Sequence, residues 1–279
     1  VEGLLGGHSG QDIDKERQNA DLLMARMIQR LLKETKGQLV SFNGGTKDNA
    51  IPRECEASLI YESDEEAAKA EELACELAET YAEELTPAEP DFSCEISCET
   101  NRTAEAIPQD AAKEFICAMR LAPNGIQKRN IKMDGFVVVS LNLGVVRTEE
   151  DRIVMIFSPR SSVASLQEDT KERLNTLAET FGFTVSHSSE YPGWSFKEDS
   201  PVREICKESY KELFGEDLKI EAIHAGLECG LFSDAIKGLD AIAIGPTIAN
   251  CHTPDEYLTL DSFERFYEFL KDILSRLAK

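Results

Sequence analysis

Phe136-Val137-Val138-Val139-Ser140-Leu141-Asn142-Leu143-Gly144-Val145-Val146-Arg147 is the stretch of sequence that decides the fold of this chain. Its β-branched and aromatic residues favour a strand. A second strand-like run, Arg152–Ser158, follows after the polar turn Thr148-Glu149-Glu150-Asp151. Two such runs joined by a short polar turn predict an antiparallel β-hairpin. This hairpin is the clearest local structure in the sequence.

Segments with helical spacing alternate with short strand-like runs around the hairpin, up to about residue 190. We expect helices over 12–36, 64–85, 108–121 and 165–181, and further strands over 38–43, 54–61, 91–99 and 183–187. This order predicts an α+β domain that has an antiparallel sheet with helices on one face. Helices and strands follow one another in a similar order twice, which suggests an internal duplication. The sequence similarity between the two halves is too weak to establish it.

The pattern changes after Tyr191-Pro192-Gly193-Trp194, which we take as a domain boundary. We expect helices over 201–214, just after Gly226 and over 260–277, with strands over 219–223 and 240–244. This alternation is typical of βαβ units and predicts a parallel sheet. Two parallel strands cannot form a stable sheet alone, so we expect the other strands upstream of Val1, in a longer polypeptide.

Composition limits the kinds of partner. The 279 residues carry a net charge of −22, which disfavours nucleic acid and anionic membrane surfaces as partners. No apolar run approaches the roughly 20 residues that cross a bilayer. The eight cysteines have irregular spacings, which indicates reduced, mostly buried thiols rather than a disulfide framework. We therefore expect a soluble, cytoplasmic protein.

Two Gly-containing turns carry imidazoles. Ile223–Leu231 contains His224 with Glu228 and Cys229, and Gly245–Glu256 contains His252. Polar turns at the ends of neighbouring strands are typical of the rim of a catalytic sheet. No other part of the chain offers enough His, Asp and Glu in strand-end contexts to complete a metal site. Cys229 suits packing better than nucleophilic attack, because no His-Cys spacing of a thiol protease is present.

Five motifs occur in order along the chain. They are Gly3–Gly10, Ser140–Val146, Tyr191–Trp194, Ile223–Gly230, and Gly245–Ile248 with His252–Glu256. Together they resemble the aminoacyl-histidine (Xaa-His) dipeptidases, or peptidase D, which are co-catalytic zinc exopeptidases related to carboxypeptidase G and carnosinase. The resemblance runs over essentially the whole chain.

The resemblance implies a two-domain enzyme. Residues 1–190 would be the lid and dimerisation domain, and residues 191–279 the C-terminal portion of the α/β catalytic domain. The substrate would be a dipeptide, especially Xaa-His, and a homodimer could form through the lid. Two zinc ions, which manganese or cobalt could replace, would serve each full-length active site. The first catalytic part has no counterpart here, so we expect this chain alone to be inactive and to hold metal weakly or not at all.

The resemblance also implies roles for two histidines. His252 would be the last metal ligand. The alternative is a surface histidine beside a turn proline. His8 would be catalytic, because a lid imidazole can donate a hydrogen bond to the oxyanion that forms at the scissile carbonyl. The alternative for His8 is a loop histidine that caps the following helix.

Four further residues are candidates for substrate binding. Arg160 suits bidentate capture of a terminal carboxylate, or alternatively pairs with surface acids. Asn142 lies inside an apolar strand, where its side-chain amide needs hydrogen-bond partners. These partners are either groups of the substrate or other parts of the protein. The turn at His224 and Gly226 precedes a helix, whose N-terminal amides can bind the carboxylate of the dipeptide.

Two other functions remain open. One is a non-catalytic, lid-type module that dimerises or binds peptides without metal. The other is a related zinc enzyme of different specificity, such as a tripeptidase or an amidohydrolase.

Overall fold

The computed structural model describes residues 1–131, 135–188, 193–194, 196–221, 224, 227–249 and 256–278. The chain divides into two compact units. Unit 1 comprises Val1–Ser189 together with Ile223–Ala225, and unit 2 comprises Glu190–Ala222 and Gly226–Lys279. None of the described helices is both long and apolar enough to cross a membrane.

An antiparallel sheet forms the centre of unit 1. Its five strands are β4 (Cys55–Ile60), β2 (Gln38–Gly44), β6 (Phe136–Thr148), β5 (Gly125–Asn130) and β7 (Ile153–Ser161). The long strand β6 pairs with β7 along one edge. Along its other edge, β6 pairs with β5 over its first part and with β2 at Val146. The predicted hairpin is therefore the β6–β7 pair, in which β6 is an interior strand and β7 an edge strand of the sheet.

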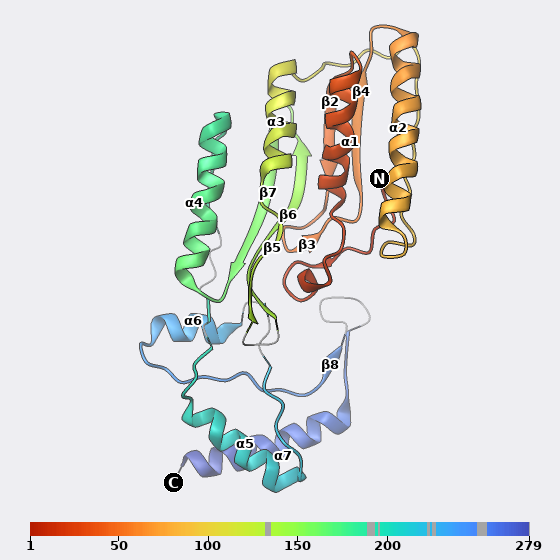
Figure 1. The fold of residues 1–279 in the computed structure, drawn as a ribbon. Coiled ribbons are helices and arrows are strands. Elements are labelled where there is room, and N and C mark those ends of the chain that lie inside the picture. Colours follow the sequence, from red (N-terminus) through yellow and green to blue (C-terminus); the bar gives the residue numbers. More distant parts are fainter. Residues whose placement is uncertain are drawn as a thin grey trace. The chain divides into compact units, whose positions relative to one another are not determined.

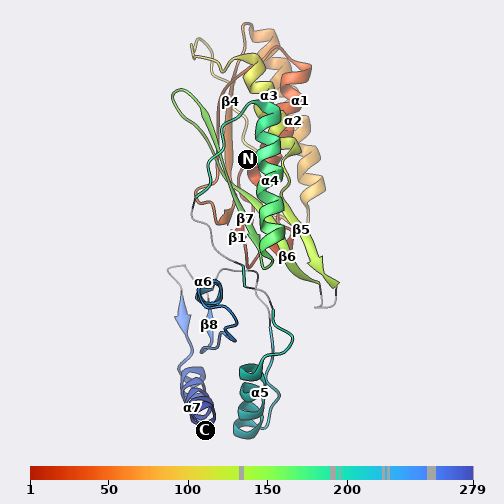
Figure 2. The ribbon, with the colours of Figure 1, turned by 90° about the vertical axis from the view of Figure 1, so that its left-hand side faces the viewer.

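Four helices of unit 1 lie on one face of this sheet (Figure 1 and Figure 2). They are α1 (Ala20–Glu34), α2 (Asp64–Leu85), α3 (Gln109–Leu121) and α4 (Ala164–Phe181). Local sequence sets their ends: the side chains of Asn19 and Ser63 accept hydrogen bonds from the first turns of α1 and α2, and Gly182 ends α4 in a left-handed conformation.

The main core lies between these helices and the sheet. Leu143 and Val146 of β6, fully buried, pack in it with apolar side chains of α1 and α3. Phe42 of β2 meets Phe115 of α3 edge to face, with ring centroids 5.4 Å apart. A small ribbon of β1 (Gly7–His8) and β3 (Ala50–Ile51), with the short helix η1 (Ile13–Lys15), adds to unit 1.

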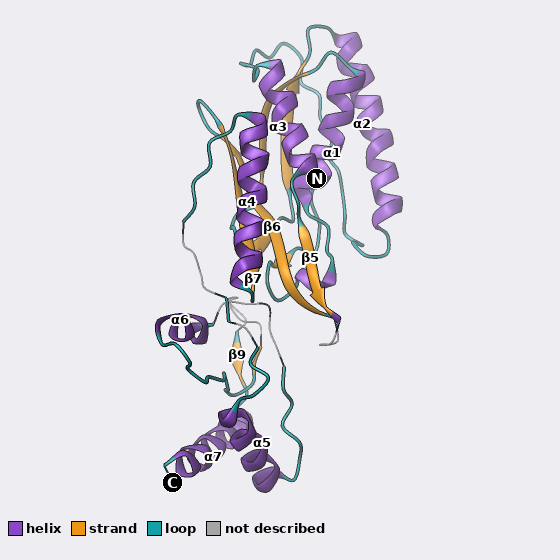
Figure 3. Ribbon diagram, turned by 60° about the vertical axis from the view of Figure 1, so that its left-hand side comes forward, coloured by secondary structure: helices purple, strands orange, loops and turns teal. Residues whose placement is uncertain are grey.

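Unit 2 has a much smaller core. Its helices α5 (Pro201–Phe214) and α7 (Leu260–Leu277) pack through Cys206, Phe269 and Ile273. The short helix α6 (Glu228–Ala235) and an antiparallel pair, β8 (Ile248–Ala249) with β9 (Tyr257–Leu258), complete its regular structure (Figure 3).

The structure corrects several sequence-based expectations in unit 1. The helix expected over 12–36 is divided into η1 and α1, because Asn19 caps a new helix. Segments 91–99 and 183–187 form no strand, and only Ser93 makes an isolated bridge, with Glu2. Alternation alone cannot form a strand where no neighbouring strand is available. Conversely, β5 was missed, because its polar sequence (GIQKRN) shows no apolar alternation.

The parallel sheet expected in the second half is absent from the described residues of unit 2. Segments 219–221 and 240–244 are irregular, and residues 222–223 lie outside the described part. Without strand partners, the apolar residues of 240–244 have no ladder to join. The antiparallel sheet with helices on one face is confirmed for unit 1, whereas the internal duplication stays a prediction.

Candidate functional site

Two polar side chains in the middle of β6 begin the candidate site. Ser140 and Asn142 alternate along the strand with Leu141 and Leu143, so the two pairs point to opposite faces of the sheet. Leu143 belongs to the core beneath the helices. Ser140 and Asn142 therefore point to the face away from that core, although both are almost fully buried.

His224 lies directly over Ser140. Its Nε2 is 2.7 Å from the Ser140 hydroxyl oxygen. Burial, and then the charge of Arg160, lower the pKa of His224 to about 4, although a hydrogen bond with the backbone of Val137 opposes this shift. A ring that donates to a carbonyl oxygen through one nitrogen can accept the Ser140 proton at the other. His224 is therefore a neutral, fixed imidazole near pH 7.

Arg160 is the charged residue of the site. It lies opposite Ser140 in the β6–β7 pair, so both side chains are on the same face. Its Nε donates to the Ser9 hydroxyl at 3.4 Å, and its two terminal nitrogens have no hydrogen-bond partner among the described residues. Burial lowers the pKa of Arg160, which the charge of Asp48 partly offsets. A half-buried guanidinium with an open fork matches a carboxylate.

The ring of His8 has a defined tautomer. Its Nδ1 accepts hydrogen bonds from the backbone amides of Gly10 at 3.2 Å and Gln11 at 3.0 Å. The neutral ring must then carry its proton on Nε2, which makes that atom a donor. The backbone amide of His8 is held by the Asp12 carboxylate at 2.8 Å.

Gly10 brings the two histidines together. A Cβ atom at this position would lie 2.3 Å from the His224 carbonyl oxygen and 3.1 Å from Cε1 of His8. Only glycine allows this close approach. His8, His224 and Arg160 thus form one cluster, joined through Gly10, Ser9 and Ser140.

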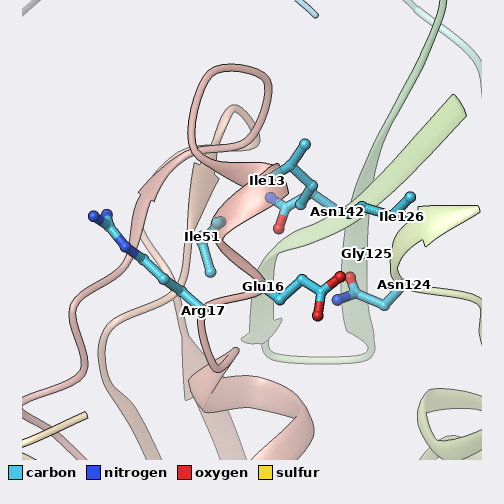
Figure 4. A pocket seen from close by; sticks show the side chains of 8 residues that line it. All are labelled: Ile13, Glu16, Arg17, Ile51, Asn124, Gly125, Ile126 and Asn142. Carbon is cyan, nitrogen blue, oxygen red and sulfur yellow. The ribbon is translucent and has the colours of Figure 1, made fainter. Parts of the chain in front are cut away.

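Asn142 lies next to this cluster along β6 and lines a cavity of about 250 Å³ (Figure 4). Its side-chain nitrogen donates to the backbone carbonyls of Asp48 at 3.2 Å and Ala50 at 2.8 Å. These bonds hold β3 and the residues just before it against β6. The structural role that the sequence allowed for Asn142 is therefore present.

The sequence had singled out His8, Asn142, Arg160 and His224, which the structure brings near one another; their roles stay predictions. Ser140 and Ser9, which contact His224 and Arg160, were not singled out. The signal for Ser140 was present, because it stands two positions before Asn142 in the same apolar strand and so shares its face. Gly226 and His252, the other two candidates, lie outside the described residues.

The described residues do not make a metal site. In this part of the chain no three His, Cys, Asp or Glu side chains come close enough together to hold a metal ion. The cluster of His8, His224 and Arg160 consists of two imidazoles and a guanidinium, and the Asp12 carboxylate beside it is bonded to the backbone of His8. Its chemistry is that of an anion site, so we assign no step of a reaction to a metal ion held by these residues.

This fold and this site can be compared with known proteins. The chain belongs to peptidase family M20/M25/M40, whose model matches residues 45–276. It is 32% identical over 281 residues to the cytosol non-specific dipeptidase of Escherichia coli strain K12, covering 99% of this chain and 57% of that relative.

The solved structure of aminoacylhistidine dipeptidase from Vibrio alginolyticus is also similar. It superposes with a TM-score of 0.85 at 34% identity, over 99% of this chain and 56% of that one. The chain therefore spans a little more than half the length of these relatives. The resemblance to the dipeptidases that the motifs indicated is confirmed.

Proposed function

We propose that this chain is the substrate-holding part of a metal-dependent dipeptidase that cleaves dipeptides, Xaa-His among them, into free amino acids. The observation that carries the proposal is the open guanidinium fork of Arg160, half-buried beside two histidines. A dipeptide has its free carboxylate one residue from the bond to be cut. One cation on a rigid strand can therefore hold the substrate for cleavage next to its end.

The similar proteins support this substrate class. One is named as a non-specific dipeptidase of the cytosol and the other as an aminoacylhistidine dipeptidase. We infer a cytoplasmic location and dipeptide substrates from these names. Dipeptidases of this family generally use metal ions such as zinc, and we propose the same dependence here. His252 remains the proposed ligand from this chain, and Gly226 a proposed part of the carboxylate-binding turn.

Different residues would bind the substrate and stabilise the charge that develops during its cleavage. Arg160 would hold the terminal carboxylate, while the neutral His224 adds no second charge that would draw the carboxylate away. His8 would donate from Nε2 to the oxygen of the scissile carbonyl as negative charge develops there. When water adds to that carbonyl, the C–N bond breaks and the amine leaves with a proton.

We also propose the domain roles that the motifs implied. Residues 1–190, which include all strands of the large sheet, would act as the lid, and residues 191–279 as the C-terminal portion of the catalytic domain. A homodimer through the lid stays a prediction.

The activity is tested on the full reading frame that encodes this chain. We expect release of free histidine from Ala-His with Zn²⁺ or Mn²⁺ present, and loss of this activity after chelation. His8→Ala should lower kcat about 100-fold, as loss of an oxyanion donor does. His187→Ala is the matched control, because His187 is exposed and its hydrogen bond among the described residues is to Asn175, far from the cluster in sequence.

Two outcomes would contradict the proposal. An unchanged kcat in His8→Ala would remove His8 from the mechanism, and a lack of hydrolysis of any dipeptide would remove the function. The 279-residue chain assayed alone should release no histidine, because the resemblance places the other metal ligands and the general base outside this chain. Turnover by the chain alone would show that further ligands are not needed.

A further inference from the structure

Glu89 is a buried carboxylate that lies just after α2 and outside the cluster described above. It is 2% exposed. Its backbone amide donates to the carbonyl of Leu85, the last residue of α2, at 2.9 Å, and its own carbonyl accepts from the amide of Phe92 at 3.2 Å. These bonds fix its position at the end of the helix. A buried carboxylate is unfavourable unless strong donors satisfy it, so its partners indicate its role.

The partners of the Glu89 side chain are two backbone amides of a distant segment. Oε2 accepts from the amide of Leu5 at 2.7 Å, and Oε1 accepts from the amide of Gln18 at 2.9 Å. Hydrogen bonds from N–H groups to an ionised carboxylate are stronger than those between neutral groups. Residues 5–18, termed the histidine loop, begin and end at these two amides and contain His8. Glu89 therefore closes the histidine loop at its base.

The chain enters the histidine loop along a fixed path. Arg53 Nε donates to the carbonyl of Leu4 at 3.0 Å, and Arg17 donates to the carbonyl of Gly6. The amide of Leu5, which lies between these two carbonyls, is the one that the carboxylate binds. Successive polar groups of the backbone are thus held from different sides, only a few residues before the imidazole.

The interior of the histidine loop fixes the imidazole itself. Nδ1 of His8 accepts from the amides of Gly10 and Gln11, and the Asp12 carboxylate accepts from the amide of His8. The amide of Asp12 donates in turn to the carbonyl of His8 at 2.9 Å. These bonds require that residues 8–12 keep their turn. The turn lies between the two ends that Glu89 joins, so a change at Glu89 can reach the ring through it.

We propose that Glu89 is a positioning residue for His8, whose carboxylate joins the two ends of the histidine loop and thereby keeps the Nε2–H of His8 in place as a hydrogen-bond donor. This role rests on the proposed function, because it takes His8 as the donor to the oxyanion. A donor held in place before the reaction stabilises the developing charge without reorganisation. Glu89 itself touches no reacting atom and acts through His8.

The first test is the kinetics of Glu89→Gln in the full reading frame, with Ala-His and Zn²⁺. The variant keeps the size of the side chain but turns an NH₂ group toward one of the two amides, which cannot accept. We expect kcat to fall about 10-fold, less than the roughly 100-fold expected for His8→Ala, with little change in KM. Glu83→Gln is the matched control, because Glu83 is exposed on α2, and its kcat should stay unchanged. An unchanged kcat in Glu89→Gln would overturn the proposal.

The double variant separates positioning from a merely structural role. If Glu89 acts through His8, adding Glu89→Gln to His8→Ala should lower kcat no further, because the donor is already absent. A structural role would lower kcat by the same factor whether or not His8 is present. A second, independent loss of kcat in the double variant would therefore contradict the assignment.

NMR of the 279-residue chain tests the same link without turnover. In the unaltered chain, the ¹⁵N shifts of the His8 ring should show Nδ1 unprotonated and Nε2 protonated. In Glu89→Gln they should move toward the average of the two tautomers, whereas Glu83→Gln should keep the original shifts. Identical His8 shifts in Glu89→Gln and in the unaltered chain would overturn the proposal.

Amide exchange in the unaltered chain keeps the proposal testable even if Glu89→Gln does not fold. The amides of Leu5 and Gln18 should exchange slowly, although Leu5 is 42% exposed, because the buried carboxylate binds both of them. Fast exchange at either amide would show that the histidine loop is not closed by Glu89.

These outcomes distinguish the positioning role from the proposed function. If the His8 tautomer depends on Glu89 but the full reading frame cleaves no dipeptide, the proposed function alone is refuted. If His8→Ala impairs cleavage of Ala-His while Glu89→Gln does not, the positioning role alone is refuted.

Discussion

Units 1 and 2 differ in how completely each buries its own apolar surface. Unit 1 covers one face of a five-stranded sheet with four helices, and side chains such as Leu143 and Val146 are fully buried. In unit 2 the buried apolar side chains are Cys206, Phe269 and Ile273, among the residues described. Most of the large apolar side chains that are exposed belong to unit 2, and many of these are on α6, β8, β9 and α7.

This difference shows that the described residues of unit 1 bury most of their apolar side chains against one another, while those of unit 2 leave many exposed. Elements with strong local signals form in both units, as α7 demonstrates. Burial, however, needs a second layer, which unit 1 has and the described part of unit 2 lacks. The candidate site, with its fixed distances, is accordingly built on the well-packed sheet of unit 1.

Hydrogen exchange should show the largest contrast between the two units. Amides of β6 should open only with global unfolding of unit 1, whereas those of α6 should open locally. We expect protection factors that differ by at least about 1,000-fold, since local opening free energies range from near zero to the global value. Mass spectrometry of exchanged peptides measures this. Equal protection of β6 and α6 would show that unit 2 is as well packed as unit 1.

Truncation of one leucine in each unit sharpens the same comparison. Leu143→Ala removes a fully buried side chain of β6 and should lower the free energy of unfolding by about 2–5 kcal/mol. Leu274→Ala in α7 removes a side chain that is 57% exposed, and should change it by no more than about 0.5 kcal/mol. Denaturant titration gives both values, and a larger loss for Leu274→Ala would reverse the interpretation.

The pH dependence of the free energy of unfolding tests the buried carboxyl group of Asp21 in unit 1. Burial raises the pKa of Asp21 to about 7, and the neighbouring Cys55 thiol offsets only part of this shift. In the unfolded chain the pKa of an aspartate is about 3.9. Between about pH 4 and pH 7, Asp21 is therefore protonated in the folded state and ionised in the unfolded state. Stability from this group is complete below pH 4 and falls as pH rises to 7, by on the order of 3 kcal/mol.

Asp21→Asn should remove this fall, which urea titrations of both proteins between pH 4 and pH 7 would detect. His224 acts with the opposite sign over nearly the same range: its pKa is lowered to about 4, so its contribution is lost as pH falls below about 6.5. The difference between parent and variant isolates Asp21, because His224 is common to both. A parallel pair of curves would show that Asp21 is ionised when folded.

The sequence predicted the helices of this protein better than its strands. α2 and α7 have the expected bounds, because amphipathic spacing and end signals act locally. Segments 91–99 and 240–244 have strand-like composition but no partner strand, while the polar β5 is a strand because β6 lies beside it. Strand pairing depends on distant residues, which local patterns do not report.

The candidate site shows the same division. Motifs identified His8, Asn142, Arg160 and His224 as special, but not that Ser140 and Ser9 join them. The role of Asn142 was ambiguous until the structure showed its side-chain amide donating to the backbone carbonyls of Asp48 and Ala50.

Local spacing and end signals by themselves predicted most helices and the β6–β7 hairpin, and the resemblance of its ordered motifs indicated the family to which the chain belongs. Only the tertiary structure decided that His8 and His224 meet across Gly10, that Arg160 keeps an open fork, and that a cavity lies beside it. The physical reason is that helix formation depends on neighbours within a few residues, whereas the long-range hydrogen bonds of this site join positions 84 to 151 residues apart.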